Sequence, residues 1–560
     1  MGRGESIVGR TGLGGVHQAR ASLFNQLQSG VPGRWAYPRA HPTPRPVCAV
    51  DLAIRCCHRS LLHIAIEPLF DQILRVTPPT DRPSSFVIGS PTVARTVVIG
   101  AGVAGLAAAL RLVDFGHEVT VLEQNSRAGG QVSADVIDGI CVETGPTAFT
   151  LPAVFRDLFR KTGRPLEREL ELVPLDPSVR YVFPDGGQLD MPNASRARIT
   201  AALDDAFGPG AGAQWEALIR DAECMWGQLR PRLLDHPPGW RDLLWFRVHP
   251  RSKQYLRRAN SLRELGMLHL QEPNLRLILD SYATLYGATP TKAPAALASL
   301  AYIEQTFGTW TVRGGLTALI EALERRLLQQ GATMRFGTPA IQVKSKYRQV
   351  TGVQVADGET IPADVVVSTA PPGQLGFDSL RARHESTVPS DGHSVFSLVL
   401  SVRHPLDLPQ RTILLTEDGP NVAVTYRSGD DPSGPCALAL HADCPSHGDG
   451  ADQTDWSDPD TAETHAQQLL GLAASRGVQV KDDVLNMHIR SPYDLEREYG
   501  ATGGRIFGQA WHGNSCIRQR RKNRSFLRGL FYAGASTHPG AGIPAVAISA
   551  ALAVDAIGRA

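Results

Sequence analysis

Residues 95–131, RTVVIGAGVAGLAAALRLVDFGHEVTVLEQNSRAGGQ, decide the fold. The stretch opens with apolar β-branched residues that suit a buried parallel strand, and helix formers follow its glycine-rich turn. In that turn Gly100 permits a tight bend, Gly102 lets the backbone approach a pyrophosphate, and Gly105 allows close packing of helix on strand. A second β-branched strand ends in Glu123, whose carboxylate can accept both hydroxyls of an adenosine ribose. Strand, turn, helix, strand and terminal acid in this register predict a dinucleotide-binding site.

The residues directly after Glu123 indicate which dinucleotide is bound. Arg127, Gly129 and Gly130 extend the pattern, and this extension resembles the dinucleotide-binding motif of flavin-dependent amine oxidases, protoporphyrinogen oxidases and carotenoid desaturases. The resemblance implies FAD as the cofactor, with Arg127 facing its phosphates and the glycine pair passing its ribityl region. The alternative for Arg127 is a surface salt bridge. Residues 141–147, CVETGPT, also resemble the segment that runs past the flavin in that superfamily.

The C-terminal residues 529–557, GLFYAGASTHPGAGIPAVAISAALAVDAI, close the same site from far away in sequence. We expect a short apolar strand and then a glycine-rich turn that permits backbone approach to a flat ring. A small-residue helix follows, and its N-terminus can stabilise negative charge on a reduced flavin. The stretch resembles the closing FAD motif of carotenoid desaturases. The expected FAD contacts here are Gly534, Gly542, Ile543, Pro544 and Ala545.

The middle of the chain narrows the resemblance to one branch. Residues 172–192 read as two strands joined by a DGG turn, which is similar to the β-hairpin of carotenoid desaturases. Residues 279–323 resemble the 1-hydroxycarotenoid 3,4-desaturases, which include the methoxyneurosporene dehydrogenases, and phytoene desaturases match less well. Residues 331–372 resemble the second FAD-contacting unit, in which the backbone around Val343 would meet the adenine.

The resemblance covers about residues 94–560 and implies an α/β fold, with a Rossmann-like FAD-binding domain and an interleaved α+β substrate domain. The expected FAD-binding segments are 93–171, 301–372 and 491–560, and the expected substrate segments are 172–300, which faces the membrane, and 373–490. Residues 1–92 carry ten Arg, no Lys and five acids, with Pro-rich stretches. This composition indicates a disordered leader or a wrongly assigned translation start, with a targeting peptide as the alternative.

The resemblance implies an FAD-dependent oxidoreductase that acts on CH–CH groups in carotenoid biosynthesis. The expected reaction introduces a C=C bond into a linear carotenoid, by 3,4-desaturation of a 1-hydroxycarotenoid. The alternatives are phytoene desaturation, amine or protoporphyrinogen oxidation on the same scaffold, and a flavin-bearing carotenoid carrier without turnover. Glu143 and His538 are the charged catalytic candidates near the flavin, and backbone hydrogen bonding and loop capping are their respective alternatives.

Composition argues against several other classes. The 57 Lys+Arg and 55 Asp+Glu give a formal net charge of +2, which argues against nucleic acid as a partner. The eight cysteines form no spaced CxxC pair, so a reducing, cytoplasmic compartment is expected. His441, Cys444 and His447 lack a second cysteine pair, and no metal site is predicted. No charge-free apolar run is long enough to predict a transmembrane helix.

A segment rich in aromatic and basic residues suggests contact with a membrane. Residues 240–246, WRDLLWF, place Trp, Leu and Phe beside Arg, as in helices that rest on anionic lipid. The alternative is an amphipathic helix that packs on the protein's own core. Because a carotenoid is supplied from lipid, we expect peripheral association with the membrane surface, through Trp240, Leu244 and Trp245. The basic run at 518–524 is expected to be a solvated or lipid-facing loop.

Overall fold

The structure is a computed structural model, and it describes residues 93–560 except 251, 257, 258, 379–381, 383, 385–391, 418, 430, 432, 481, 514 and 515. These residues belong to one compact unit, Ile88–Ala560. The predicted leader, residues 1–92, lies outside the described residues.

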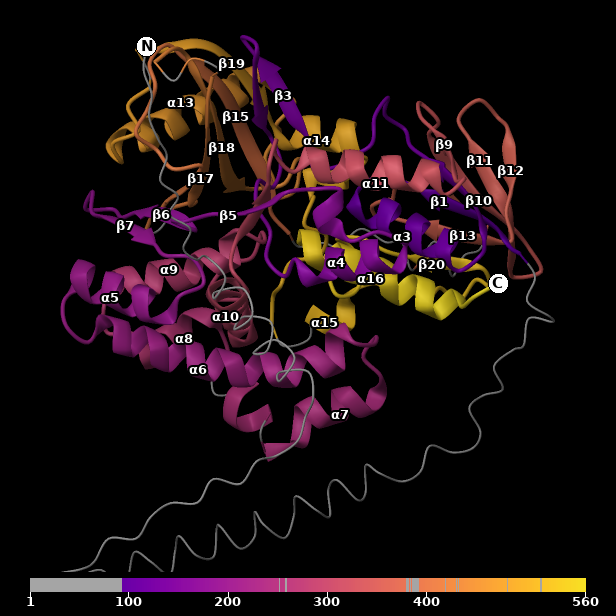
Figure 1. The fold of residues 1–560 in the computed structure, drawn as a ribbon, viewed down its shortest axis with the longest axis horizontal. Helices are drawn as coiled ribbons and strands as arrows, with labels where there is room; N and C mark the ends of the chain where they lie inside the picture. Colours follow the sequence, from indigo (N-terminus) through magenta and orange to yellow (C-terminus); the bar gives the residue numbers. More distant parts are fainter. Residues whose placement is uncertain are drawn as a thin grey trace, which may run out of the picture. The chain divides into compact units, whose positions relative to one another are not determined.

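A parallel five-stranded sheet is built around the glycine-rich turn. Its strand order is β20-β13-β1-β2-β9, and each adjacent pair is parallel. The strands are β1 (Arg95–Ile99), β2 (Glu118–Leu122), β9 (Thr333–Arg335), β13 (Val365–Ser368) and β20 (Leu530–Tyr532). Successive residues of β1 are buried on opposite faces, as the predicted run of β-branched residues requires. The sheet therefore joins segments from both ends of the described chain (Figure 1).

Helices cover one face of this sheet, and a second sheet covers the other. The helices are α3 (Val103–Asp114), α4 (Ala153–Lys161), α11 (Thr317–Gln329) and α16 (Ile543–Ile557). Val98 of β1 is buried against them, together with the alanines of α3 and α16. Val97 instead packs toward the sheet β12-β11-β10-β14. The strands of that sheet are β10 (Ala340–Lys346), β11 (Gln349–Val355), β12 (Thr360–Pro362) and β14 (Gly376–Phe377).

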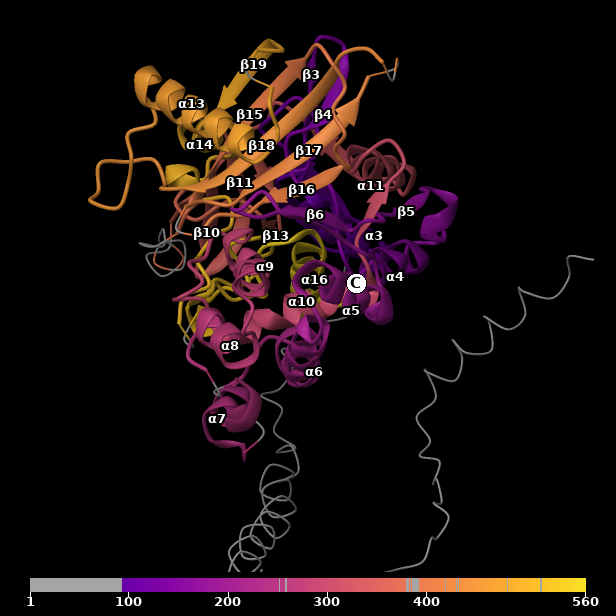
Figure 2. The same ribbon diagram turned by 90° about the vertical axis from the view of Figure 1, so that its left-hand side faces the viewer.

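A seven-stranded sheet forms the second half of the unit, in the order β19-β15-β18-β17-β16-β6-β7. Its strands are β6 (Val179–Val182), β7 (Gln188–Met191), β15 (Ser394–Val402), β16 (Arg411–Leu414), β17 (Val422–Ser428), β18 (Cys436–Cys444) and β19 (Val484–Arg490). The pair β6–β7 confirms the predicted hairpin, since Val182 lies opposite Gln188. The helix α13 (Pro459–Ser475) packs its apolar face on one side of this sheet (Figure 2).

A layer of helices lies below this sheet in Figures 1 and 2. It contains α5 (Arg196–Phe207), α6 (Ala211–Leu229), α7 (Trp240–Val248), α8 (Leu262–His269), α9 (Pro273–Thr284) and α10 (Ala298–Phe307). In both views α7 is the lowest of these helices. Within the described ranges, no helix combines the length and apolar character needed to cross a bilayer.

Short elements connect these layers. Strands β3 (Ala134–Ile137) and β4 (Ile140–Glu143) form one hairpin, and β5 (Leu172–Pro174) pairs with β8 (Trp310–Val312). Two further α-helices are α14 (Pro492–Tyr499) and α15 (Cys516–Gln519). The remaining single-turn 3₁₀ and π elements are Leu166–Arg168, Arg230–Leu234, Ser252–Leu256, Ala295–Leu297 and Thr502–Gly504.

Candidate functional site

A cavity of about 1020 Å³ begins at the carboxyl ends of the parallel strands and continues into the helical layer. Its lining includes Gly100, Glu123 and Thr369, which directly follow β1, β2 and β13, and Gly534, which lies two residues after β20. This edge is where open α/β sheets bind nucleotides. At the other end, the lining comes from α6, α7, α9, α10 and the inner face of the seven-stranded sheet.

The three glycines of the turn serve different purposes. Gly100 has φ +97°, and a Cβ there would lie 2.3 Å from Oγ1 of Thr369. A Cβ at Gly105 would lie 1.8 Å from the carbonyl oxygen of Gly100, so helix and strand pack as closely as predicted. Gly102 has an ordinary φ of −75°, and a Cβ there would meet no protein atom closer than 3.7 Å. Gly102 lines the cavity. The protein leaves space at this point, and the space fits a pyrophosphate.

The N-terminus of α3 lies beside this space. The helix begins at Val103, and the first N–H groups of a helix have no partner within the helix. Gly129 and Gly130 pair with the turn through a bridge between Gly102 and Gly129, and both have positive φ. All of these residues line the cavity. Backbone N–H groups and a helix dipole therefore surround the place predicted for the phosphates.

Arg127 does not reach this place. Its side chain is exposed, and Nη2 donates a hydrogen bond to the carbonyl oxygen of Ala134 at 3.4 Å. Arg127 is absent from the cavity lining, so its predicted phosphate contact stays a prediction.

Glu123 occupies the position predicted for a ribose ligand. Its side chain is buried and lines the cavity. Oε2 accepts a hydrogen bond from the Ala101 N–H at 2.7 Å, and Oε1 accepts one from the Asn125 N–H at 2.9 Å. The two backbone donors fix the carboxylate, and each oxygen can accept a further hydrogen bond from a ribose hydroxyl.

The cavity wall lies beside Val343, the residue that the sequence suggested for the adenine contact. Val343 is fully buried in the core between the two sheets and does not line the cavity. The lining here comes from Ala340 on the same strand and from Gln374 and Leu375. Gln374 donates a hydrogen bond to Gln124, which follows Glu123. The predicted FAD segment 301–372 includes Pro371 but ends before Gln374 and Leu375, which sequence reasoning missed.

The C-terminal turn reaches the cavity from its opposite side. Gly534, Gly542, Ile543, Pro544 and Ala545 all line it. The helix α16 begins at Ile543, where the sequence predicted a helix N-terminus. Its positive end therefore faces the cavity. The segment 144–151 forms the facing wall.

The contacts of Glu143 favour its structural alternative. The side chain is buried, and Oε1 accepts a hydrogen bond from the Leu316 N–H at 2.6 Å. Burial raises the pKa of this carboxyl, while Nη2 of Arg427 on β17 lies 3.6 Å from its Oε2. Glu143 does not line the cavity. Its contacts tie β4 to the start of α11.

His538 lines the cavity but is fixed to the loops around it. Its ring nitrogen Nε2 pairs with the carbonyl oxygen of Leu233, and its backbone N–H donates to Arg521. Its own carbonyl oxygen accepts a hydrogen bond from Oγ of Ser549 at 2.7 Å. Burial lowers the pKa of the His538 imidazole to about 4, so the ring is neutral at pH 7. These contacts match the loop-capping alternative.

The basic run at 518–524 contains a buried arginine, which corrects the expectation of a wholly solvated loop. Arg520 lines the cavity and is 4% exposed. Its guanidinium lies 3.9 Å from the centre of the Trp511 ring, and Nη2 donates to the Gln509 carbonyl oxygen at 2.9 Å. Burial lowers the pKa of Arg520 to about 10. Lys522 and Arg524 are exposed, since the chain here buries alternate residues.

His441 and His447 have separate hydrogen-bond partners. His441 pairs with Ser397 Oγ at 2.8 Å, whereas His447 pairs with the Trp456 N–H at 3.1 Å. Among the described residues, no three His, Cys, Asp or Glu side chains gather as metal ligands would.

Comparisons with known proteins agree with this geometry. A family model described as flavin containing amine oxidoreductase matches residues 103–558. A hydroxyneurosporene desaturase of Cereibacter sphaeroides is 30% identical and covers 83% of this chain and 97% of its own. A phytoene dehydrogenase of Streptomyces griseus is 29% identical and covers 82% of this chain and 94% of its own. In fold, the chain resembles an oxidoreductase from Methanosarcina mazei, with a TM-score of 0.56 and 17% identity over 82% of this chain and 100% of that one.

The family match identifies the cofactor as FAD. In this cavity the glycine turn, Glu123 and the start of α16 would hold it. From its family model, its relatives and its strand-end cavity, the chain belongs to the flavin-containing amine oxidoreductases, among their FAD-dependent carotenoid desaturases.

Proposed function

We propose that this protein desaturates a linear carotenoid, and that its reaction is the 3,4-desaturation of a 1-hydroxycarotenoid. The observation that carries this proposal is the continuity of the cavity from the nucleotide-binding turn into an apolar region between helices. The apolar lining there includes Trp226, Leu243, Phe246, Leu285 and Ile303. Such a lining suits a long hydrocarbon chain held against the flavin.

The proposed chemistry removes two hydrogens from neighbouring carbons. When bound, FAD supplies the acceptor for a hydride, and a proton leaves the adjacent carbon as the C=C bond forms. The polyene spreads the developing positive charge, so the protein needs no strong base. The apolar side chains of α6, α7 and α9 hold the polyene and keep water away from the reacting bond.

Amine oxidation is the second candidate, because the structure brings aromatic rings to the C-terminal turn. A Cβ at Gly542 would lie 3.3 Å from the Tyr286 ring, and one at Gly540 would lie 3.0 Å from Trp511. These rings come from segments outside residues 529–557. Anaerobic mixing with aliphatic amines should leave bound FAD oxidised if the chain is a desaturase.

Pigment analysis tests the proposed function. A host that makes lycopene and 1-hydroxylycopene is compared with and without the protein. Co-expression should convert the hydroxylated pigment to a product that has lost two hydrogens and absorbs at longer wavelength. Conversion of phytoene instead would assign the phytoene alternative. Unchanged pigments in the presence of FAD-loaded protein would reject the desaturase. In a separate anaerobic experiment, failure of added pigment to reduce the bound FAD would favour a carrier.

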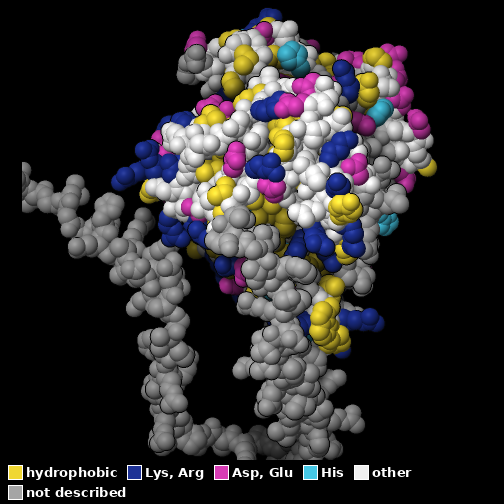
Figure 3. All heavy atoms as spheres, turned by 90° about the vertical axis from the view of Figure 1, so that its right-hand side faces the viewer, with side chains coloured by type: hydrophobic (Ala, Val, Ile, Leu, Met, Phe, Trp, Pro, Cys, Tyr) yellow, Lys and Arg dark blue, Asp and Glu magenta, His cyan; other side chains and the backbone are white. Residues whose placement is uncertain are grey.

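We also propose that α7 docks on a membrane at the mouth of the cavity. Leu243 and Phe246 line the cavity, whereas Trp240 is 73% exposed and Leu244 is 44% exposed. The lower end of the described chain in Figure 3 carries apolar and basic side chains side by side. Apolar side chains among cations suit an interface with anionic lipid.

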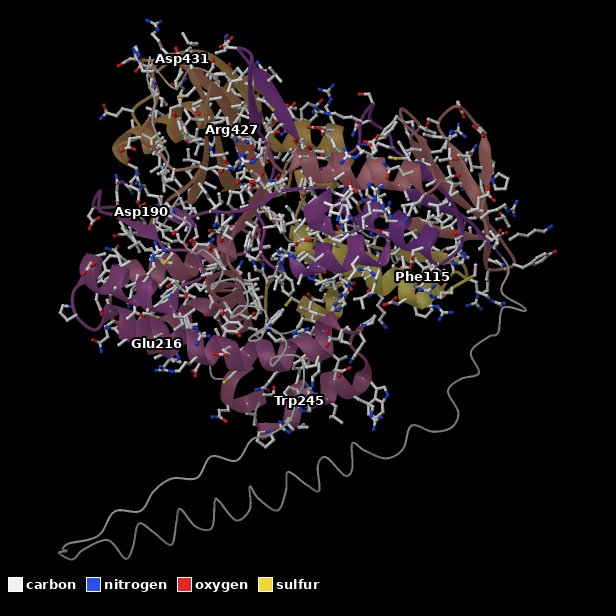
Figure 4. The ribbon with its side chains drawn as sticks, viewed as in Figure 1. Phe115, Asp190, Glu216, Trp245, Arg427 and Asp431 are labelled. Carbon is white, nitrogen blue, oxygen red and sulfur yellow. The ribbon has the colours of Figure 1, made fainter. Side chains whose placement is uncertain are left out.

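Trp245 takes no part in this surface, which corrects the expectation for that residue. Its ring is 6% exposed and stacks on His249 at 4.7 Å, with the Arg232 guanidinium 3.7 Å from the ring centre. Figure 4 shows Trp245 on α7. Core packing therefore accounts for Trp245, and the proposed lipid contact rests on Trp240 and Leu244.

A further inference from the structure

An ion pair lies in the apolar end of the cavity. Glu304 of α10 and Arg411 of β16 both line the cavity, and Nη1 of Arg411 lies 2.8 Å from Oε1 of Glu304. The Glu304 side chain is 11% exposed, and the Arg411 side chain is 19% exposed. Taking two charges out of water is costly unless their remaining hydrogen-bonding atoms find partners.

The pair keeps one hydrogen-bonding edge open. Arg411 makes its hydrogen bonds through Nη1, to Glu304 and to the Ser178 carbonyl oxygen at 3.4 Å. Glu304 makes its side-chain hydrogen bonds through Oε1, from Arg411 and from Oγ1 of Thr309 at 3.2 Å. No described residue bonds Oε2 of Glu304 or Nε and Nη2 of Arg411, and none of these three atoms is fully buried. An acceptor and a donor thus stand side by side at the cavity wall.

Tyr286 on the cavity wall lies within the electrostatic reach of the pair. Burial raises the pKa of the Tyr286 phenol, and the negative charge of Glu304 raises it further. The same ring would lie 3.3 Å from a Cβ at Gly542, directly before α16. Tyr286 therefore links the ion pair to the turn that approaches the flavin.

We propose that Glu304 and Arg411 bind the hydroxyl group at the end of the polyene. An alcohol is both donor and acceptor, so it can donate to Oε2 of Glu304 and accept from the guanidinium of Arg411. In a 1-hydroxycarotenoid the hydroxyl-bearing carbon is two bonds from C3, so the hydroxyl must lie beside the bond that reacts. This inference rests on the proposed function, because it makes the pair the feature that selects hydroxylated over hydrocarbon carotenoids.

The test compares two substrates in the FAD-loaded full chain. The variant Glu304→Leu/Arg411→Met replaces the pair by apolar side chains of similar volume, which avoids leaving one charge buried alone. The measured quantity is the ratio of kcat/KM for a 1-hydroxycarotenoid to kcat/KM for its hydrocarbon counterpart. Loss of two hydrogen bonds to the hydroxyl should lower this ratio by about 10–100-fold. An unchanged ratio, or a parallel loss with both substrates, would overturn the proposal.

A second ion pair provides a matched control. Nε of Arg263 lies 2.8 Å from Oδ2 of Asp280, which is 8% exposed, and neither residue lines the cavity. Arg263→Met/Asp280→Leu should keep the selectivity ratio of the parent. If the control lowers the ratio as much as the test variant, the effect reflects packing, and the proposal fails.

Binding separates this inference from the proposed function. The dissociation constants of the hydroxylated and hydrocarbon polyenes can be measured from their absorbance changes without turnover. If the parent binds the alcohol more tightly and the variant does not, the subsite stands even where no pigment is desaturated. If the parent desaturates carotenoids and binds both polyenes equally, the desaturase stands and the subsite falls.

Discussion

At the nucleotide end the cavity is walled mainly by backbone, whereas at the helical end it is walled by side chains. The N-termini of α3 and α16 present N–H groups at the nucleotide end, and Gly102 leaves open space. The helical end presents side chains of α6, α7, α9 and α10, with Glu304 and Arg411 among them. Where backbone lines the cavity, an added side chain takes the space of the ligand. Where side chains line it, a substitution changes the shape and polarity of the cavity gradually. Substitutions at the first end should therefore abolish binding, and those at the second should alter selectivity.

The largest expected effect is loss of FAD from Gly102→Val. The glycine has an ordinary φ, and a Cβ there would meet no protein atom closer than 3.7 Å, so the valine variant should fold without strain and fill the phosphate space. Bound flavin, measured by absorbance after gel filtration, should fall by about tenfold or more because phosphate and side chain compete for one volume.

Gly471→Val is the matched control for this prediction. Gly471 lies in α13, where a Cβ would meet nothing within 4 Å. The control should retain its flavin, and both variants should keep the circular dichroism of the parent. Full flavin occupancy in Gly102→Val would show that the phosphates lie elsewhere, and would remove the contrast between the two ends.

A smaller effect is expected from Trp240→Ser/Leu244→Ser at the mouth of the helical end. Removing two exposed apolar side chains should weaken binding to anionic liposomes by about tenfold or more and leave FAD bound. Added salt should weaken binding of the parent, since part of the attraction is screened. Leu328→Ser/Leu485→Ser, which removes exposed apolar residues from α11 and β19, should sediment with liposomes like the parent. Equal sedimentation of all three proteins would move the docking surface away from α7.

The smallest effect concerns pH and the junction between the two ends. Burial lowers the pKa of His538 from its ordinary 6.5 to about 4, so the unfolded chain binds more protons between these values. The free energy of unfolding should therefore fall as pH drops from 6.5 toward 4. His441, whose pKa burial also lowers to about 4, acts in the same direction, whereas His393 beside Asp443 has a raised pKa and opposes it.

Urea titrations at pH 7.5 and pH 4.5 measure this dependence. His538→Gln should reduce the loss of stability between the two pH values by about 1–3 kcal/mol, as the shifted histidine no longer contributes. His404→Gln, at a side chain that is 66% exposed, is the control. An equal pH dependence in parent and His538→Gln would show that the ring is not held neutral by burial.

The nucleotide end could be predicted from the sequence because its contacts are local. Gly100, Gly105 and Glu123 lie within one strand–helix–strand unit, and Ile543 begins a helix that follows directly from its glycine turn. Periodicity and turn chemistry fix such positions before any tertiary contact forms. The predicted segment boundaries of the two domains remain predictions.

The helical end could not be predicted in the same way. Glu304 and Arg411 are 107 residues apart in sequence, and Arg411 lies on β16 of a sheet whose strand order differs from the sequence order. Arg520 is buried within a basic run, and Trp245 is buried within an aromatic helix. Arg520 packs on Trp511, and Trp245 packs on Arg232. Composition identifies the segment in such cases, whereas packing decides which side chain turns inward.

The position of β20 and α16 in the sheet has a consequence for biosynthesis. One edge of the parallel sheet and one wall of the flavin site are formed by residues 530–557. During translation the phosphate-binding turn emerges from the ribosome long before the strand and helix that complete the pocket. Cofactor loading must therefore wait for the last segment of the chain, and a nascent chain stalled before residue 530 would expose a nucleotide cradle that cannot close.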